Sequence, residues 1–275
     1  MKSMQKRPVA YQLYSAREDA QKDLDAVLGR LAAMGYDGVE FAGLYGHSAE
    51  DVAAMLQKYR LQAVSSHVPV MRIEEDMFGV IAEQRRLGCR YLAVPFLDET
   101  MRPGAPGFAR VLRMVYRFAS LCREAGIQLL YHNHDFEFVP VSGLYGLDFL
   151  YGAVPAHLLQ TELDVCWIRY AGEDPVAYLR KYAGRCPVVH LKDYVGVRGD
   201  TSPYGLLGRA EEKKENVPFA FRPFGHGCQD VQAVVGAALE SGVQWFVIEQ
   251  DQSPDRPALE AAQMSLETLR KLGVK

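Results

Sequence analysis

The sequence lacks the features that assign a chain to several common protein classes. Its five cysteines are dispersed and none forms a CxxC pair, which excludes zinc-finger and thioredoxin-like sites. An odd, scattered set of cysteines indicates reduced thiols, and we therefore expect a cytoplasmic protein. No apolar run approaches the ~20 residues of a membrane helix, and the N-terminal MKSMQKRPVAYQLYS has no apolar core typical of a signal peptide. We expect no membrane partner.

An excess of positive charge is missing too. The 31 Lys and Arg residues against 34 Asp and Glu give a net charge of -3, which argues against a nucleic-acid partner. No GxGxxG motif follows the first apolar segment, so a dinucleotide-binding fold is unsupported. With 275 residues, 49% of them hydrophobic, the chain is long enough to bury a large core.

One junction recurs along the chain, in which an amphipathic helix ends at a glycine and a short apolar strand follows. It occurs as LAAMGYDGVEF, EQRRLGCRYLAV, CREAGIQLLYH and LESGVQWFVIE. Two further junctions keep this pattern without the glycine. Together with the N-terminal VAYQLYS and the segment HLLQTELD, the pattern predicts eight strands, near 8–14, 36–41, 61–67, 90–95, 127–133, 158–164, 186–191 and 243–249.

Helical patterns separate these strands, and such strict alternation predicts a parallel sheet with crossover helices. Eight units in a chain of this length favour a closed (β/α)8 TIM barrel, formed as a single domain by residues 1–275. A doubly wound open sheet is the alternative. The connection at about 193–228 is unusually long, and we expect it near the active-site face, because loops longer than ~15 residues are usually functional or disordered.

Polar groups gather where the predicted strands end. In a TIM barrel these C-terminal ends share one rim, and active sites lie there. Seven of the eight ends carry polar or ionisable side chains, whereas the opposite ends are mostly apolar. The strand ends are Tyr14, Glu40, His67, Pro95, His132 to His134, Glu162 with Asp164, His190 with Lys192, and Glu249 with Asp251. This asymmetry predicts a functional site at the rim.

Three of these residues are predicted to bind one divalent metal ion. Asp164, His190 and Glu249 end consecutive strands, and their oxygen and nitrogen donors suit Mn, Co, Zn or Mg. Glu162 alternates with Leu163 and therefore faces the same side of its strand as Asp164, where it could orient a ligand.

Other polar residues are predicted to contact a substrate. Each also has a structural interpretation: Glu40 could pair with a basic neighbour, and Lys192 could form a surface ion pair with Asp193. Trp167 is either a packing residue or the wall of a sugar pocket. The predicted substrate-binding residues are Tyr14, Glu40, His67, His134 and Lys192 at the strand ends, and Arg222 and His226 in the long connection.

An ordered set of motifs spans nearly the whole chain: YQLYSARED, GYDGVEFAG, AVSSHVPV, YHNHDFEF, TELDVCWIRYAGEDP, HLKD, FGHGCQD and WFVIEQDQSP. Taken in this order, they resemble the sugar phosphate isomerase/epimerase family of xylose-isomerase-like TIM barrels. The resemblance implies a metal held by a Glu, Asp, His, Glu set, whose last three members fall on Asp164, His190 and Glu249. His132 stands where many relatives carry the first Glu. We expect Glu137 to be the fourth ligand, with His132 as the alternative.

The resemblance also implies an activity. We expect an isomerase or epimerase of carbohydrate metabolism that removes a proton next to the carbonyl of a sugar or keto-sugar, through an enediolate. Glu249 and either Glu137 or His132 would act as acid and base. A keto-sugar or keto-glycoside lyase or dehydratase is the alternative, because a histidine suits a one-sided base. An endonuclease IV-like DNA repair hydrolase and a non-catalytic sugar binder are less favoured. The oligomeric state is open, and a homo-oligomer is one option.

Overall fold

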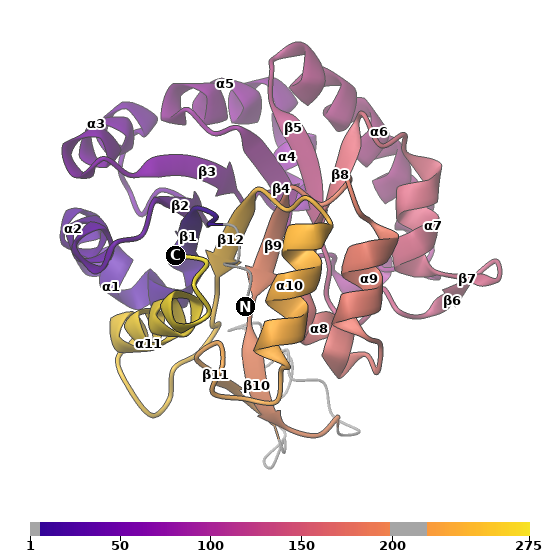
Figure 1. Cartoon of the computed structure of the whole chain (residues 1–275). Coiled ribbons are helices and arrows are strands. Elements are labelled where there is room, and N and C mark those ends of the chain that lie inside the picture. The colour runs from indigo at the N-terminus through magenta and orange to yellow at the C-terminus, as the bar shows by residue number, and fades with distance from the viewer. Residues whose placement is uncertain (1–5, 199–218) are drawn as a thin grey trace.

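A computed structural model describes residues 6–198 and 219–275, and its centre is an eight-stranded parallel barrel (Figure 1). All eight predicted strands are present, with bounds within a few residues of those expected. They are β1 (Val9–Gln12), β2 (Gly38–Phe41), β3 (Gln62–Ser66), β4 (Tyr91–Val94), β5 (Gln128–His132), β8 (Leu159–Asp164), β9 (Val188–Leu191) and β12 (Trp245–Ile248).

The strand order confirms the barrel and excludes the doubly wound sheet. It runs β3-β2-β1-β12-β9-β8-β5-β4, and every pairing in it is parallel. A parallel backbone bridge between His67 and Ala93 joins the two outermost strands, β3 and β4. The circle is therefore nearly closed, and β12 lies beside β1.

Helices surround the barrel on its outside (Figure 1). Gly35 and Gly88 end α2 and α5 in the left-handed conformation, and Arg60 adopts the same conformation at a junction that has no glycine. The helices are α1 (Arg17–Lys22), α2 (Leu24–Met34), α3 (Ala49–Tyr59), α4 (Val70–Glu75), α5 (Met77–Leu87), α6 (Phe108–Glu124), α7 (Gly146–Ala153), α8 (Val165–Tyr170), α9 (Pro175–Lys181), α10 (Val231–Glu240) and α11 (Ala258–Lys271), with short 3-10 turns η1 (Leu13–Ala16) and η2 (Glu99–Met101). None of the described helices is both long and apolar enough to cross a membrane.

The barrel interior changes from apolar to polar along the strands. A small inner core includes Leu130, Val188 and Val247, separate from the large core between strands and helices. Side chains two residues apart share one face of a strand, so the next inward positions on β5 and β9 are His132 and His190. The fold therefore places these buried polar groups directly next to the apolar inner core.

The long connection at 193–228 begins and ends as a two-stranded antiparallel ribbon of β10 (Asp193–Gly196) and β11 (Phe219–Arg222). Residues 199–218 lie outside the described part of the chain. A second short ribbon, β6 (Pro140–Val141) with β7 (Leu144–Tyr145), follows β5. Asp193 is buried and is not part of a surface ion pair. Its carboxylate instead accepts hydrogen bonds from the backbone N–H groups of Tyr194, Gly225, Gly227, Cys228 and Gln229.

Gly227 is predicted to be essential for this anchored loop. A Cβ at Gly227 would lie 2.2 Å from Asp193 Oδ1 and 2.3 Å from the Tyr194 carbonyl oxygen. We expect Gly227→Ala to lower the free energy of unfolding by about 1–3 kcal/mol, as overpacking does. Gly236→Ala is the matched control, because a Cβ at this position in α10 would meet nothing within 4 Å. We expect it to be neutral or slightly stabilising. Equal denaturant midpoints for the two variants would contradict this assignment.

Candidate metal centre

Four buried side chains converge at the C-terminal rim of the barrel. This rim set consists of His132, Asp164, His190 and Glu249, which come from or directly follow the four neighbouring strands β5, β8, β9 and β12. One donor atom from each lies within 4.8 Å of the others. His132 Nε2 is 3.5 Å from Asp164 Oδ2 and 3.8 Å from Glu249 Oε2, and His190 Nδ1 is 2.9 Å from Glu249 Oε2.

The chemistry of the rim set fits a divalent metal ion. Among the described residues, both ring nitrogens of His132 are buried without a hydrogen-bond partner, which is costly unless a ligand satisfies one of them. Burial, followed by the charge of His190, lowers the pKa of His132, so its imidazole is neutral and can donate a lone pair. Two donors about 2.1 Å from a tetrahedral ion lie about 3.4 Å apart, close to the separation of His132 from Asp164.

Lys192 is buried beside the rim set. Its Nζ lies 2.7 Å from Glu249 Oε2, 3.1 Å from Asp164 Oδ2 and 2.9 Å from Asp251 Oδ2. Burial alone would lower the pKa of Lys192, but these three carboxylates outweigh it and hold the pKa well above its usual value. Three carboxylates against one ammonium leave two negative charges, and one divalent cation would balance them.

A second group, the inner set, consists of Glu40, His67, Glu162 and His190. His190 Nε2 lies 2.7 Å from Glu40 Oε1 and 2.6 Å from Glu162 Oε1, and His67 Nε2 lies 2.7 Å from Glu162 Oε1. These separations are those of charge-assisted hydrogen bonds. Burial works against a charged imidazole, but Glu40 and Glu162 raise the pKa of His67 to about 10. The inner set thus balances its own charge.

The inner set also orients the histidine that the two groups share. Burial disfavours a charged His190, but Glu40 and Glu162 beside Nε2 and Glu249 beside Nδ1 outweigh it and hold the pKa of this imidazole well above its usual value. A metal ion at the rim set would take the place of the proton on Nδ1, while Nε2 keeps its proton. Glu162 therefore lies on the same side of β8 as Asp164, as the strand periodicity predicted. Glu40 lies beneath the rim and contacts histidines rather than a surface neighbour.

The structure does not bring Glu137 to the rim set. Its carboxylate accepts hydrogen bonds from the Tyr131 hydroxyl at 2.7 Å and the His134 backbone N–H at 2.8 Å. Tyr131 belongs to the core outside the barrel, whereas His132 faces the interior. In this structure Glu137 therefore lies outside the rim set, and His132 lies beside Asp164 and Glu249 in its place. The alternation of side chains along β5 indicated that His132 faces the barrel interior. The path of the turn after β5, which sets the place of Glu137, could not be predicted from the sequence.

A cavity of about 390 Å³, the main pocket, opens onto the rim set. Four of the predicted substrate-binding residues line it: Tyr14, His67, His134 and Lys192. Glu40 does not line it. Arg222 and His226, both in the described part of the chain, also lie outside its lining, and His226 is exposed. Sequence reasoning missed Arg72 and Phe96 as lining residues, because they lie in or near loops without a chemical motif.

An aromatic cluster supports one side of this pocket. Trp167 is fully buried and packs in it as a structural residue, with Lys192 Nζ 5.4 Å from its ring centroid. The ring of His134 stacks on Phe136 and meets Phe96 edge-on. These contacts fix the orientation of His134 at the pocket wall.

Comparisons with known proteins agree with this architecture. The family model described as xylose isomerase-like TIM barrel matches residues 28–272. The chain is 27% identical over 253 residues to an inosose dehydratase of Geobacillus kaustophilus, covering 84% of this chain and 80% of that protein. A crystal structure of a sugar phosphate isomerase/epimerase from Parabacteroides distasonis is similar in fold, with 22% identity, a TM-score of 0.78, and coverage of 98% of this chain and 100% of that one. The structure of an IolI protein with a bound zinc atom gives 16% identity, a TM-score of 0.71, and coverage of 97% and 98%.

Metal retention distinguishes the two candidates for the fourth position. We expect His132→Ala to weaken metal binding by more than the ~10–100-fold that loss of a supporting partner costs, because it removes a donor atom. Glu137→Gln should keep the metal. The measurement is metal content after dialysis against a weak chelator, with circular dichroism to verify folding. Metal lost from Glu137→Gln and kept in His132→Ala would reverse the assignment.

Glu137 should instead make stability depend on pH. Burial raises its pKa to about 8, although the hydrogen bonds from Tyr131 and His134 oppose this. Between about pH 5 and pH 8 the unfolded chain has this carboxyl ionised while the folded chain keeps it protonated. The free energy of unfolding therefore falls as pH rises through this window. Denaturant unfolding at several pH values should show this slope in the wild type relative to Glu137→Gln, and parallel curves would refute it.

Proposed function

The chain belongs to the xylose isomerase-like TIM barrel family, and from this premise we propose that it is a divalent-metal-dependent enzyme acting on a sugar or keto-sugar. The proposed reaction removes a proton from the carbon next to a carbonyl and returns it, giving isomerisation or epimerisation. The observation that carries the proposal is the rim set, four buried donors of which His132 and Glu249 line a pocket of small-molecule size.

The rim set would hold the metal through His132, Asp164, His190 and Glu249. A divalent ion bound there supplies a Lewis acid that polarises the carbonyl and stabilises the negative charge that develops beside it. The zinc atom in a protein of the same fold supports a divalent ion here as well. Zn, Mn, Co and Mg all suit these donors.

The side chains that line the main pocket would handle the proton. Glu249 is 5% exposed and lines the pocket, and we assign it the transfer of the proton at the substrate carbon. His132 lines the pocket beside it and would bind the metal rather than transfer a proton, because its lone pair would be held by the ion. Lys192 would present a fixed positive charge to substrate oxygens, because its ammonium is held in place by Asp164, Asp251 and Glu249. His67, His134 and Tyr14 would bind hydroxyl groups.

We add Asp251 to the side chains proposed to handle the proton. Burial, opposed by Lys192, raises its pKa to about 6, so it changes charge close to neutral pH. It lines the main pocket and lies 2.9 Å from the Lys192 ammonium. A carboxyl with this pKa is suited to general acid–base work. We propose that it accepts or returns the substrate proton as the partner of Glu249.

Dehydration is the second candidate. It is favoured by the 27% identity to an inosose dehydratase and by His132, which stands where two-carboxylate epimerases would need a second glutamate. In that reaction the same proton is removed, and a hydroxyl leaves from the next carbon with a proton supplied by the enzyme.

A cytoplasmic location remains a prediction from the cysteines, of which all five are free.

Solvent exchange tests the proposed reaction. We expect metal-loaded enzyme in D₂O to incorporate deuterium next to the carbonyl of at least one member of a panel of ketoses, 3-keto-glycosides and inosose. Nuclear magnetic resonance and mass spectrometry would follow the label. Glu249→Gln should lower exchange by at least ~100-fold, which is the low end for loss of an acid–base group.

Product analysis then separates the two reactions. A new stereoisomer or ketose–aldose pair indicates isomerisation or epimerisation, whereas a product 18 Da lighter indicates dehydration. Glu260→Ala, on the exposed face of α11, is the matched control and should keep full exchange. Lack of exchange on every compound, with metal bound, would reject proton abstraction.

A further inference from the structure

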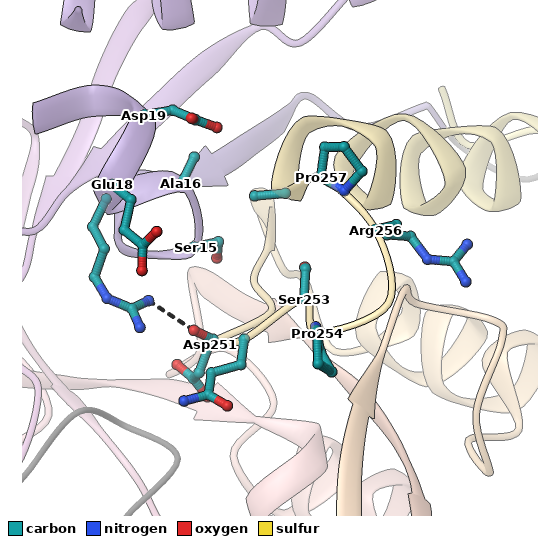
Figure 2. A pocket seen from close by; sticks show the side chains of 12 residues that line it. Ser15, Ala16, Glu18, Asp19, Asp251, Ser253, Pro254, Arg256 and Pro257 are labelled. Atoms are coloured by element: carbon teal, nitrogen blue, oxygen red, sulfur yellow. Dashed lines mark hydrogen bonds between the residues drawn. The ribbon is translucent and has the colours of Figure 1, made fainter. Parts of the chain in front are cut away.

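A second cavity of about 380 Å³ lies at the same rim as the main pocket. It is a groove between the segment that follows β1 and the segment that follows β12. Figure 2 shows Ser15 and Glu18 on one side of it, Ser253 and Arg256 on the other, and Asp251 at its base. Because β1 pairs directly with β12, both walls belong to neighbouring strand ends. Of the residues that line this groove, the proposed reaction uses only Asp251.

The groove and the main pocket meet at Asp251, which lines both. Arg17 fixes the boundary: its guanidinium donates to the backbone oxygens of Asp251 at 2.7 Å and Tyr14 at 2.9 Å. It also stacks over the Tyr14 ring, 4.3 Å from the centroid, and Tyr14 lines the main pocket. The two cavities therefore share a wall at Asp251, and a ligand that extends from the main pocket across this residue would reach the groove.

The lining of the groove suits a neutral, hydroxyl-rich group. The carboxylates of Glu18 and Asp19 would repel an anion such as a phosphate, and the third, Asp251, is paired with Lys192. Its two arginines are committed elsewhere, since Arg256 pairs with Asp255 at 2.9 Å and Arg17 donates to backbone oxygens. The carboxylates of the groove can accept hydrogen bonds from sugar hydroxyls, and its serine hydroxyl and glutamine amide groups can both donate and accept.

We infer that the groove is a second subsite, which holds a neutral glycosyl substituent of a substrate whose carbonyl-bearing ring occupies the main pocket. This inference rests on the proposed function and narrows its substrate class from a single sugar to a keto-glycoside of disaccharide size. Each cavity alone has the size of a small-molecule site, which agrees with one sugar ring in each. Asp251 and Arg17 would lie at the bond between the two rings.

A selectivity measurement tests the subsite. The probes are 3-ketoglucose and 3-keto-cellobiose, which carries a second glucose, and the quantity is the ratio of their kcat/KM values for solvent exchange. We expect wild type to favour the disaccharide by at least tenfold. Glu18→Trp and Pro254→Trp, at two exposed positions on opposite walls, should each fill the groove and lower this ratio at least tenfold. Glu260→Ala, outside the groove, should leave the ratio unchanged.

The outcomes separate this inference from the proposed function. Exchange on both sugars with a ratio that neither tryptophan variant changes would overturn the subsite and leave the proposed function standing. Absence of exchange on every sugar would overturn the proposed function. The subsite is then decided by saturation-transfer nuclear magnetic resonance with unoxidised cellobiose. Signal on the protons of both rings, with one ring losing it in both tryptophan variants, supports the subsite, and no difference between wild type and variants rejects it.

Discussion

The architecture of the site depends on one buried imidazole, that of His190, which is contacted by carboxylates at both ring nitrogens. Glu40 and Glu162 lie beside Nε2, and Glu249 lies beside Nδ1. These residues come from the ends of β2, β8, β9 and β12, strands that are brought around one axis only when the sheet curves into a barrel. Burying so many charges costs free energy, and an apolar replacement of similar volume is often neutral or stabilising. Their presence is therefore better explained by the chemistry of the site than by stability.

The division into two layers follows from the contact distances. In the inner set, nitrogen and oxygen lie 2.6–3.1 Å apart, within hydrogen-bonding distance. In the rim set, His132 lies 3.5 Å and 3.8 Å from its carboxylate neighbours, beyond good hydrogen bonds. Short contacts therefore hold His190 in the inner set, while His132 at the rim has room for an ion between it and the carboxylates. This difference is consistent with a metal ion in the rim set and with shared protons in the inner set below it.

Much of this arrangement could be predicted from the sequence. Six helix–strand junctions, four of them with a glycine, and two further apolar segments gave all eight strands. Alternation along β5 and β8 placed His132, Glu162 and Asp164 on the inner face. Two features could not be predicted. The contact of Glu40 with His190 joins residues 150 positions apart, and strand periodicity carries no information on barrel register. The turn after β5 places Glu137 against Tyr131 because of tertiary packing, which no local pattern of the sequence records.

Lys192 connects the metal centre to the substrate cavities. Its ammonium contacts Asp164 and Glu249 of the rim set and also Asp251, where the main pocket and the groove meet. Burial would otherwise drive these carboxylates towards their protonated forms, and the nearby positive charge opposes this. The balance differs among the three: it leaves the pKa of Glu249 well below its usual range but the pKa of Asp251 at about 6. Glu249 and Asp251, which both contact Lys192, therefore differ in pKa, and Asp251 is the one that changes charge near neutral pH. Such a pair can provide a fixed negative charge for the metal and a titrating group for the substrate within the same cavity.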